Sequence, residues 1–132
     1  MANRYLVKSG VWSDPSVWSA TSGGSSGASV PTSSDTVYIN ANYTVTLTSD
    51  AACNFLRHTN GTLILSSHKL TSGYQFLSYG STSRTLNLGS GTLEVGVGSS
   101  DALLTLSGSN LTFEAGTSLI VINTSLSDTY NT

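Results

Sequence analysis

Three stretches of this chain superpose on one gapless twelve-residue template, and this self-similarity constrains the fold more than any other feature. Each stretch begins with Thr-Leu, has Leu or Phe at its ninth position and ends with Gly: TLILSSHKLTSG at 62–73, TLNLGSGTLEVG at 85–96 and TLSGSNLTFEAG at 105–116. Successive stretches are offset by 23 and 20 residues. A unit of this length, made of short strand-forming runs, is typical of stacked solenoids.

The rest of the sequence predicts an all-β chain. Ser and Thr account for 43 of the 132 residues and charged residues for only 9%, a bias that suits pleated surface. No window has the apolar spacing of a long amphipathic helix, and Asn60-Gly61 is the one two-residue hairpin signal. We therefore expect a right-handed parallel β-helix (β-solenoid) of about four coils with an N-terminal cap. A β-sandwich is the alternative.

The chain divides into a capping leader at 1–34, solenoid coils at 35–124 and a C-terminal tail at 125–132. Tyr74 and Phe76 are two positions apart on a strand, so we expect both in the core. The apolar residues that recur along the template predict the rest of the interior column, namely Leu63, Leu65, Leu70, Leu86, Leu88, Leu93, Leu106, Leu111 and Phe113.

Both tryptophans, Trp12 and Trp18, lie in the leader on either side of a turn. The first coil of a solenoid exposes unpaired strand edges, and two Trp rings bury enough area to cover them. Exposed aromatic rings can instead stack on sugars. Trp12, Trp18 and Tyr79 are therefore the candidate ligand-binding residues, and Tyr79 could equally contact a neighbouring subunit.

The leader carries a resemblance to a known class of proteins. GVWSDPSVWS at 10–19, SGG at 22–24 and VPTSSDTV at 30–37 together resemble a leader of tail-fibre and other virion structural proteins of tailed bacteriophages. Similar leaders precede parallel β-helix regions in bacterial surface proteins. The resemblance covers roughly residues 4–47 and brings no catalytic residue with it.

This resemblance implies a structural protein of the virion, of tail-fibre or tailspike type, that recognises the host surface. The expected partners are further copies in a trimer, or other virion proteins, and a cell-surface glycan. The alternative function is an extracellular carbohydrate-binding module or a surface adhesin.

Charge and hydropathy exclude two classes of partner. The five basic residues are scattered and the net charge is −2, so nucleic acid is not an expected partner. The longest apolar run, at 119–122, is far shorter than the ~20 residues that cross a bilayer. Membrane insertion is therefore not expected.

A few residue pairs could in principle carry chemistry. Glu94 and Glu114 share the tenth template position, and stacking would put them on one face, either facing solvent, binding a cation or forming a glycosidase pair. His58, His68 and Cys53 lack the further ligands of a zinc site and the third group of a catalytic triad. We expect a solvated face for the glutamates, and no enzyme activity, catalytic residue, metal or cofactor.

Overall fold

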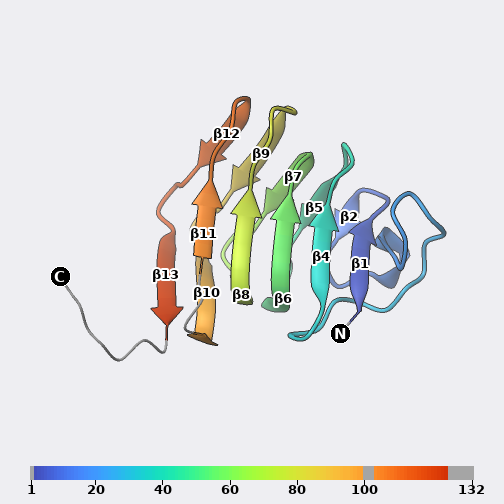
Figure 1. Cartoon of the computed structure of the whole chain (residues 1–132), viewed down its shortest axis with the longest axis horizontal. Coiled ribbons are helices and arrows are strands. Elements are labelled where there is room, and N and C mark those ends of the chain that lie inside the picture. Colours follow the sequence, from blue (N-terminus) through green and yellow to red (C-terminus); the bar gives the residue numbers. More distant parts are fainter. Residues whose placement is uncertain (1, 100–102, 125–132) are drawn as a thin grey trace.

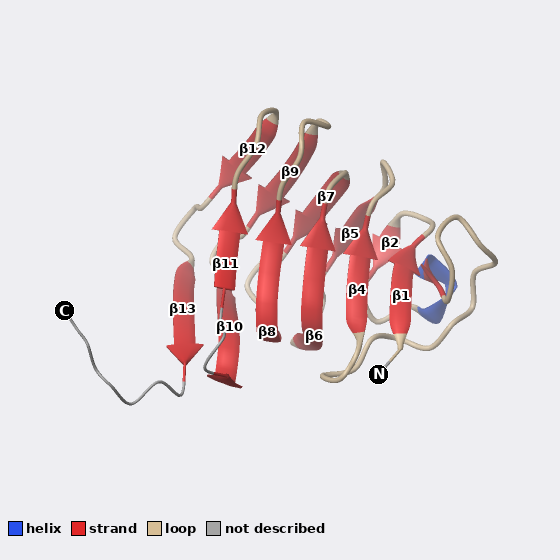
Figure 2. Cartoon of the chain, in the orientation of Figure 1, coloured by secondary structure: helices blue, strands red, loops and turns tan. Residues whose placement is uncertain are grey.

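The computed structural model describes residues 2–99 and 103–124, which form two β-sheets and one short 3-10 helix (Figure 1, Figure 2). Sheet A has the strand order β13-β10-β8-β6-β4-β1-β3, with β11 also paired to β8, and sheet B has the order β12-β9-β7-β5-β2. The elements are β1 (Asn3–Leu6), β2 (Gly10–Val11), η1 (Pro15–Val17), β3 (Trp18–Ser19), β4 (Thr36–Ile39), β5 (Thr44–Thr46), β6 (Ala51–His58), β7 (Gly61–Ile64), β8 (Lys69–Ser78), β9 (Arg84–Asn87), β10 (Thr92–Ser99), β11 (Leu103–Leu106), β12 (Leu111–Glu114) and β13 (Leu119–Thr124).

The two sheets form two layers, and after the leader the chain alternates between them (Figure 1). We call each consecutive pair of strands, one from each sheet, a rung: β4 with β5, β6 with β7, β8 with β9, and β10 and β11 with β12. Neighbouring rungs pair in parallel in both sheets. The protein is thus an all-β structure with parallel sheets, an arrangement compatible with a solenoid.

The core lies between the two layers. In sheet B, Leu63 of one rung pairs with Leu86 of the next, and both side chains are fully buried. Burying one such side chain stabilises the fold by roughly 1.5–3 kcal/mol. Six of the predicted interior residues are fully buried, which confirms them: Leu63, Leu65, Leu70, Leu86, Leu88 and Leu93.

The other three predicted interior residues are not buried. Leu106 and Leu111 are half-buried and pack against the core, as predicted, whereas Phe113 is 40% exposed, so the prediction was wrong for Phe113. Phe113 pairs in register with Leu86 and therefore occupies the right column. Among the described residues, however, no strand covers the far side of β12, and the column ends uncovered there.

The third copy of the twelve-residue template is out of register with the first two. Thr62 pairs with Thr85 as the template predicts, but Thr85 pairs with Thr112 rather than with Thr105. Thr105 lies in sheet A beside Leu77. The cause is a longer rung, because Leu103 lies eight positions after Val95 whereas their partners on β8 are three positions apart. The third stretch therefore matches the template in its residue pattern but does not occupy the equivalent position in its rung.

The leader packs its tryptophans inside the fold. The Trp12 and Trp18 rings meet edge-on with centroids 5.0 Å apart, and Trp18 Nε1 donates to the Trp12 carbonyl over 2.8 Å. β3 runs antiparallel along the outer edge of β1, while β1 and β2 pair in parallel with β4 and β5. The leader thus supplies strands to both sheets as well as a cover for an edge. The predicted tail at 125–132 lies outside the described residues.

Asp35 fastens the leader to the first full rung. Its buried carboxylate accepts hydrogen bonds from the backbone N–H groups of Ala2 and Thr32 and from the Thr32 hydroxyl. Burial alone would raise the pKa of Asp35, but these hydrogen bonds and the Arg4 charge outweigh it and hold the pKa below its ordinary value. The ionised carboxylate therefore holds two segments of the leader, at Ala2 and Thr32, against the start of β4.

The contrast between buried column and open end predicts the outcome of two identical substitutions. Ile39 is fully buried, whereas Ile122, which pairs with the buried Val95, is 47% exposed. Ile39→Ala should lower the free energy of unfolding by about 2–5 kcal/mol, and Ile122→Ala by about 0.5 kcal/mol or less. Urea unfolding of both variants measures this. Equal losses would mean that the open end is covered in solution.

Candidate functional site: an aromatic track on sheet A

Aromatic side chains gather on the outer face of sheet A. Tyr5 of β1 and Tyr38 of β4 are register partners, and their rings stack with centroids 4.5 Å apart and planes 8° from parallel. Tyr38 lies between the buried Val37 and Ile39, so strand alternation directs its ring away from the core. Both tyrosines are half-buried. Two adjacent strands therefore present a stacked pair of phenol rings.

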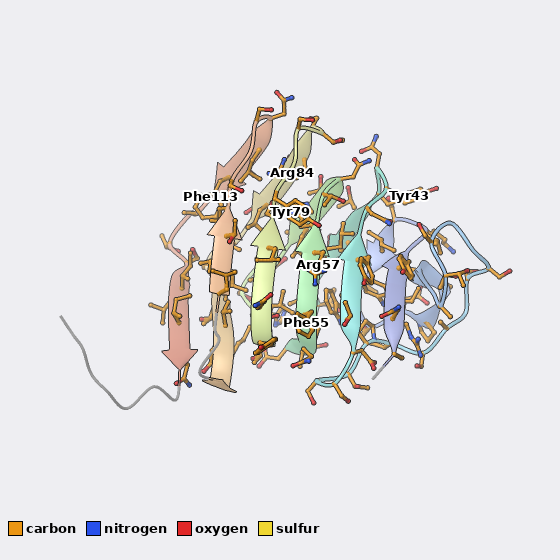
Figure 3. All side chains as sticks on the ribbon, in the orientation of Figure 1. Tyr43, Phe55, Arg57, Tyr79, Arg84 and Phe113 are labelled. Atoms are coloured by element: carbon orange, nitrogen blue, oxygen red, sulfur yellow. The ribbon has the colours of Figure 1, made fainter. Side chains whose placement is uncertain are left out.

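The next two strands extend this row. Arg57 of β6 is the register partner of Tyr38, and its guanidinium lies over the Phe55 ring, 5.6 Å from the centroid. Phe55 in turn packs edge-to-face against Tyr74 of β8, with centroids 4.7 Å apart. Figure 3 shows Arg57 and Phe55 on the near face of β6. We call Tyr5, Tyr38, Phe55, Arg57 and Tyr74 the aromatic track.

Tyr74 belongs to this track because of a β-bulge. Cys53 pairs with Ser72 but Phe55 pairs with Gln75, so β8 carries one extra residue between these pairs. A bulge re-aims the side chains beside it. Phe76 is fully buried as predicted, but Tyr74 is half-buried against the outward Phe55. The prediction that both rings lie in the core was wrong for Tyr74.

Three residues of the track, Arg57, Tyr5 and Tyr38, have donors that the fold leaves uncommitted. No side-chain or backbone acceptor among the described residues takes a hydrogen bond from Arg57, and none bonds the hydroxyls of Tyr5 and Tyr38. The nearest charge-related contact of Arg57 is the Phe55 ring itself. The track thus combines apolar ring surface with three residues whose hydrogen-bond donors the described fold does not use.

Comparisons with family models, curated proteins and solved structures return no match. The track must therefore be judged on its own geometry. Sequence reasoning missed it, although a signal was present. Tyr38 sits between two residues of the core, and Arg57 follows the buried Leu56 directly; alternation from these buried neighbours marks both as outward.

The three predicted ligand-binding residues lie in two different environments. Trp12 is 3% exposed and Trp18 is fully buried, so neither ring is offered to a ligand, and both serve as core of the leader. Tyr79 is 39% exposed. Figure 3 places it at the rim where β8 ends, apart from Phe55 and the rest of the track.

The two glutamates do not form a pair. Glu94 is in sheet A, where it pairs with Thr71 and Val121, whereas Glu114 is in sheet B beside Asn87. The expectation that they share a face was wrong, because the third template is displaced by the longer rung. Glu94 bonds Lys69 over 2.7 Å and accepts from Asn123; these contacts hold its pKa below the ordinary value.

Cys53 and His58 also do not form a pair. The Cys53 thiol is fully buried and bonds the Ser72 hydroxyl over 3.7 Å. Burial raises its pKa to about 12, so the reactive thiolate is suppressed. Over the described residues, no group of three or more His, Cys, Asp or Glu side chains could hold a metal ion. In the same residues, no helix has the length and apolar character needed to cross a membrane.

His58 instead belongs to a chain of buried polar groups. Its Nε2 lies 3.1 Å from the Gly61 carbonyl, which can only accept, so Nε2 carries the proton. Nδ1 then accepts from the Ser78 hydroxyl over 3.1 Å, and Ser78 accepts from Arg84 Nε over 2.9 Å. Every polar side-chain atom of His58, Ser78 and Arg84 thus has a hydrogen-bond partner, which is what burial of such groups requires.

Arg84 connects the corners of two rungs. Its guanidinium, in a side chain 2% exposed, donates to the carbonyls of Gly80 and Thr82 on one corner and of Ser107 and Ser109 on the next. The buried Ser78 and His58 are enclosed beneath these corners. Ser78 and His58 therefore stabilise the corner, and because both are fully buried, a substrate cannot reach them.

The buried histidine predicts how stability depends on pH. Burial lowers the pKa of His58 to about 4, with the Gly61 hydrogen bond opposing and the Arg84 charge reinforcing the shift. In the unfolded chain this group titrates at an ordinary pKa near 6.5. Between these values the unfolded state binds the extra proton, so stability is full above 6.5 and falls as the pH drops to 4. The loss attributable to His58 is about 3 kcal/mol.

Urea unfolding between pH 7.5 and 4.5 measures this dependence. His58→Gln should be less stable at neutral pH but should lack the decline through this window. His68→Gln is the matched control, because His68 is partly exposed beside Asp50, and it should keep the wild-type decline. A wild-type decline that survives in His58→Gln would contradict this assignment.

Proposed function

We propose that this protein is a non-catalytic attachment protein that presents the aromatic track to glycans on a cell surface. In this proposal the two alternating parallel sheets form a right-handed β-helix of about four coils, and the leader is its N-terminal cap. The scaffold fixes the track, and no residue acts as a catalyst. The separation of Glu94 from Glu114 and the burial of Cys53 and His58 support leaving catalysis out.

The observation that carries the proposal is the continuity of the track across four strands. β1, β4, β6 and β8 are consecutive neighbours in sheet A, and strands lie about 4.8 Å apart. The track therefore extends roughly 14 Å, which suits an oligosaccharide more than a single sugar. Ring surface next to phenol and guanidinium donors matches the C–H faces and hydroxyls of sugars, as amphipathic Tyr side chains do in many interfaces.

The virion is the proposed setting. The leader at 10–37 resembles that of phage tail-fibre and virion structural proteins. The open end supports membership of a larger assembly, because Phe113 and Ile122 occupy column positions yet are 40% and 47% exposed. Exposed apolar groups beside a free strand edge mark interfaces. A trimer, or contact with other virion proteins, would cover this end.

A free-standing extracellular carbohydrate-binding module or surface adhesin is the second candidate. It would use the same track without the covered end. Mass measurement in solution separates the two. A trimer favours the fibre, and a monomer favours the module.

A glycan array tests the site itself. Tyr38→Ala removes the ring at the middle of the track and should lower the affinity for any bound glycan by about tenfold or more, equivalent to about 1.4 kcal/mol. Tyr43→Ala is the matched control, because Tyr43 is 40% exposed at a corner outside the track, and it should bind as wild type. Thermal unfolding of both variants checks that each is folded.

Tyr79→Ala tests the alternative that the glycan binds at the rim. If the rim residue Tyr79 and not the track forms the site, this variant should lose binding while Tyr38→Ala retains it. That result would move the site to the rim. Absence of binding to any glycan by the wild-type protein would overturn the proposed function.

A further inference from the structure

We propose that the glycan held by the aromatic track is an acidic polysaccharide, and that Arg57 binds the carboxylate of one of its sugars. This inference rests on the proposed function and adds the chemical class of the ligand. It depends on a contrast between Arg57 and every other cation of the chain.

The two other arginines are consumed by the fold. Arg4 donates from Nε and both terminal nitrogens to Ser29 and Asn3 of the leader. Arg84 donates from Nε and both terminal nitrogens to Ser78 and the corner carbonyls. Each guanidinium therefore has a backbone or hydroxyl acceptor at all three of its nitrogens. Arg57 has the same donors, yet no described residue accepts from them.

The lysines are engaged as well. Lys69 forms its ion pair with Glu94, and Lys8 lies 3.4 Å from the Ser16 hydroxyl in the leader. No acidic side chain among the described residues forms an ion pair with Arg57. Five acidic residues are described. Asp14 lies in the leader, Asp35 and Asp50 directly precede β4 and β6, Glu114 lies on sheet B, and Glu94 lies in β10 of sheet A, where it is paired with Lys69. Within residues 2–99 and 103–124, the positive charge on the track therefore has no ion-pair partner.

The surroundings of Arg57 leave its N–H donors open to a ligand. The guanidinium lies over Phe55, between its register partners Tyr38 and Leu77 on the adjoining strands. Stacking on a ring engages the flat face of a guanidinium and leaves the N–H groups at its edge available. The hydroxyls of Tyr5 and Tyr38 continue the row of free donors along the stack. A row of donors with one full positive charge favours an anion rich in acceptors.

A sugar carboxylate fits this arrangement better than a phosphodiester. The planar carboxylate matches the fork of a guanidinium with two parallel hydrogen bonds. In a uronic acid the carboxylate is attached directly to the pyranose ring, so the ring carbons would contact Phe55 and Tyr38 while the charge meets Arg57. A polymer linked by phosphodiesters through flexible polyols offers the charge without that adjacent apolar ring.

Titration calorimetry with an oligogalacturonate and with its methyl ester tests this inference, because esterification removes the charge and leaves the sugar chain. The wild-type protein should prefer the acid, and Arg57→Gln should weaken acid binding by roughly 10-fold to 100-fold and abolish the preference for acid over ester. Arg57→Lys keeps the charge without the fork and should lose only part of the affinity. Added salt should weaken acid binding alone.

Lys8→Gln is the matched control, since it also removes one positive charge but lies in the leader away from the track; it should bind the acid as wild type. Equal binding of acid and ester by the wild-type protein would overturn the inference and leave the proposed function standing. Stronger binding of a glycerol-phosphate polymer would also overturn it. Absence of binding to every glycan, these two included, would overturn both proposals.

Discussion

The parallel pairing of each rung with the next is the constraint on which the rest of this structure depends. A column such as Leu63 above Leu86 stays buried only if equivalent positions fall at the same place in consecutive rungs. The fold absorbs a change of rung length between Val95 and Leu103 by docking two strands, β10 and β11, on the single strand β8. β10 pairs with β8 as far as Val95, and β11 pairs with it again from Leu103.

One corner of the interior is polar, and it stays stable because each group there is satisfied. Arg84 brings a charge into a buried site without an acidic partner, but carbonyls from two successive corners surround it. Ser78 and His58 complete the chain of hydrogen bonds to Gly61. Removing one member of such a network would leave a buried polar group unpaired, which costs more than the bond itself contributes. The apolar column and the polar corner therefore specify the same stacking by different means.

The sequence predicted what depends on local pattern and failed where rung length or a bulge intervened. Strand character and the Leu63–Leu86 column follow from alternation and from the first two templates. The third template misled because twelve matching residues carry no information on how long the intervening connection is. The track could not be predicted for the same reason. Tyr5, Tyr38 and Arg57 are adjacent in space but unevenly spaced along the chain. Tyr74 reached the outer face only through an extra residue in β8.

The two outer faces differ in a way that folding does not require. On sheet B, consecutive rungs present Thr44, Thr62, Thr85 and Thr112 in one register, small β-branched residues that suit an exposed sheet. On sheet A, strands β1, β4, β6 and β8 carry rings and an arginine at outward positions, beside residues such as Thr71 and Leu77. Cross-strand ring pairs contribute only about 0.2–1 kcal/mol each, and the threonine face stacks without them. Arg57 contributes its contact with the Phe55 ring, but it forms no ion pair or hydrogen bond with the described residues. The proposed contact with a ligand would explain this asymmetry, which stability alone does not require.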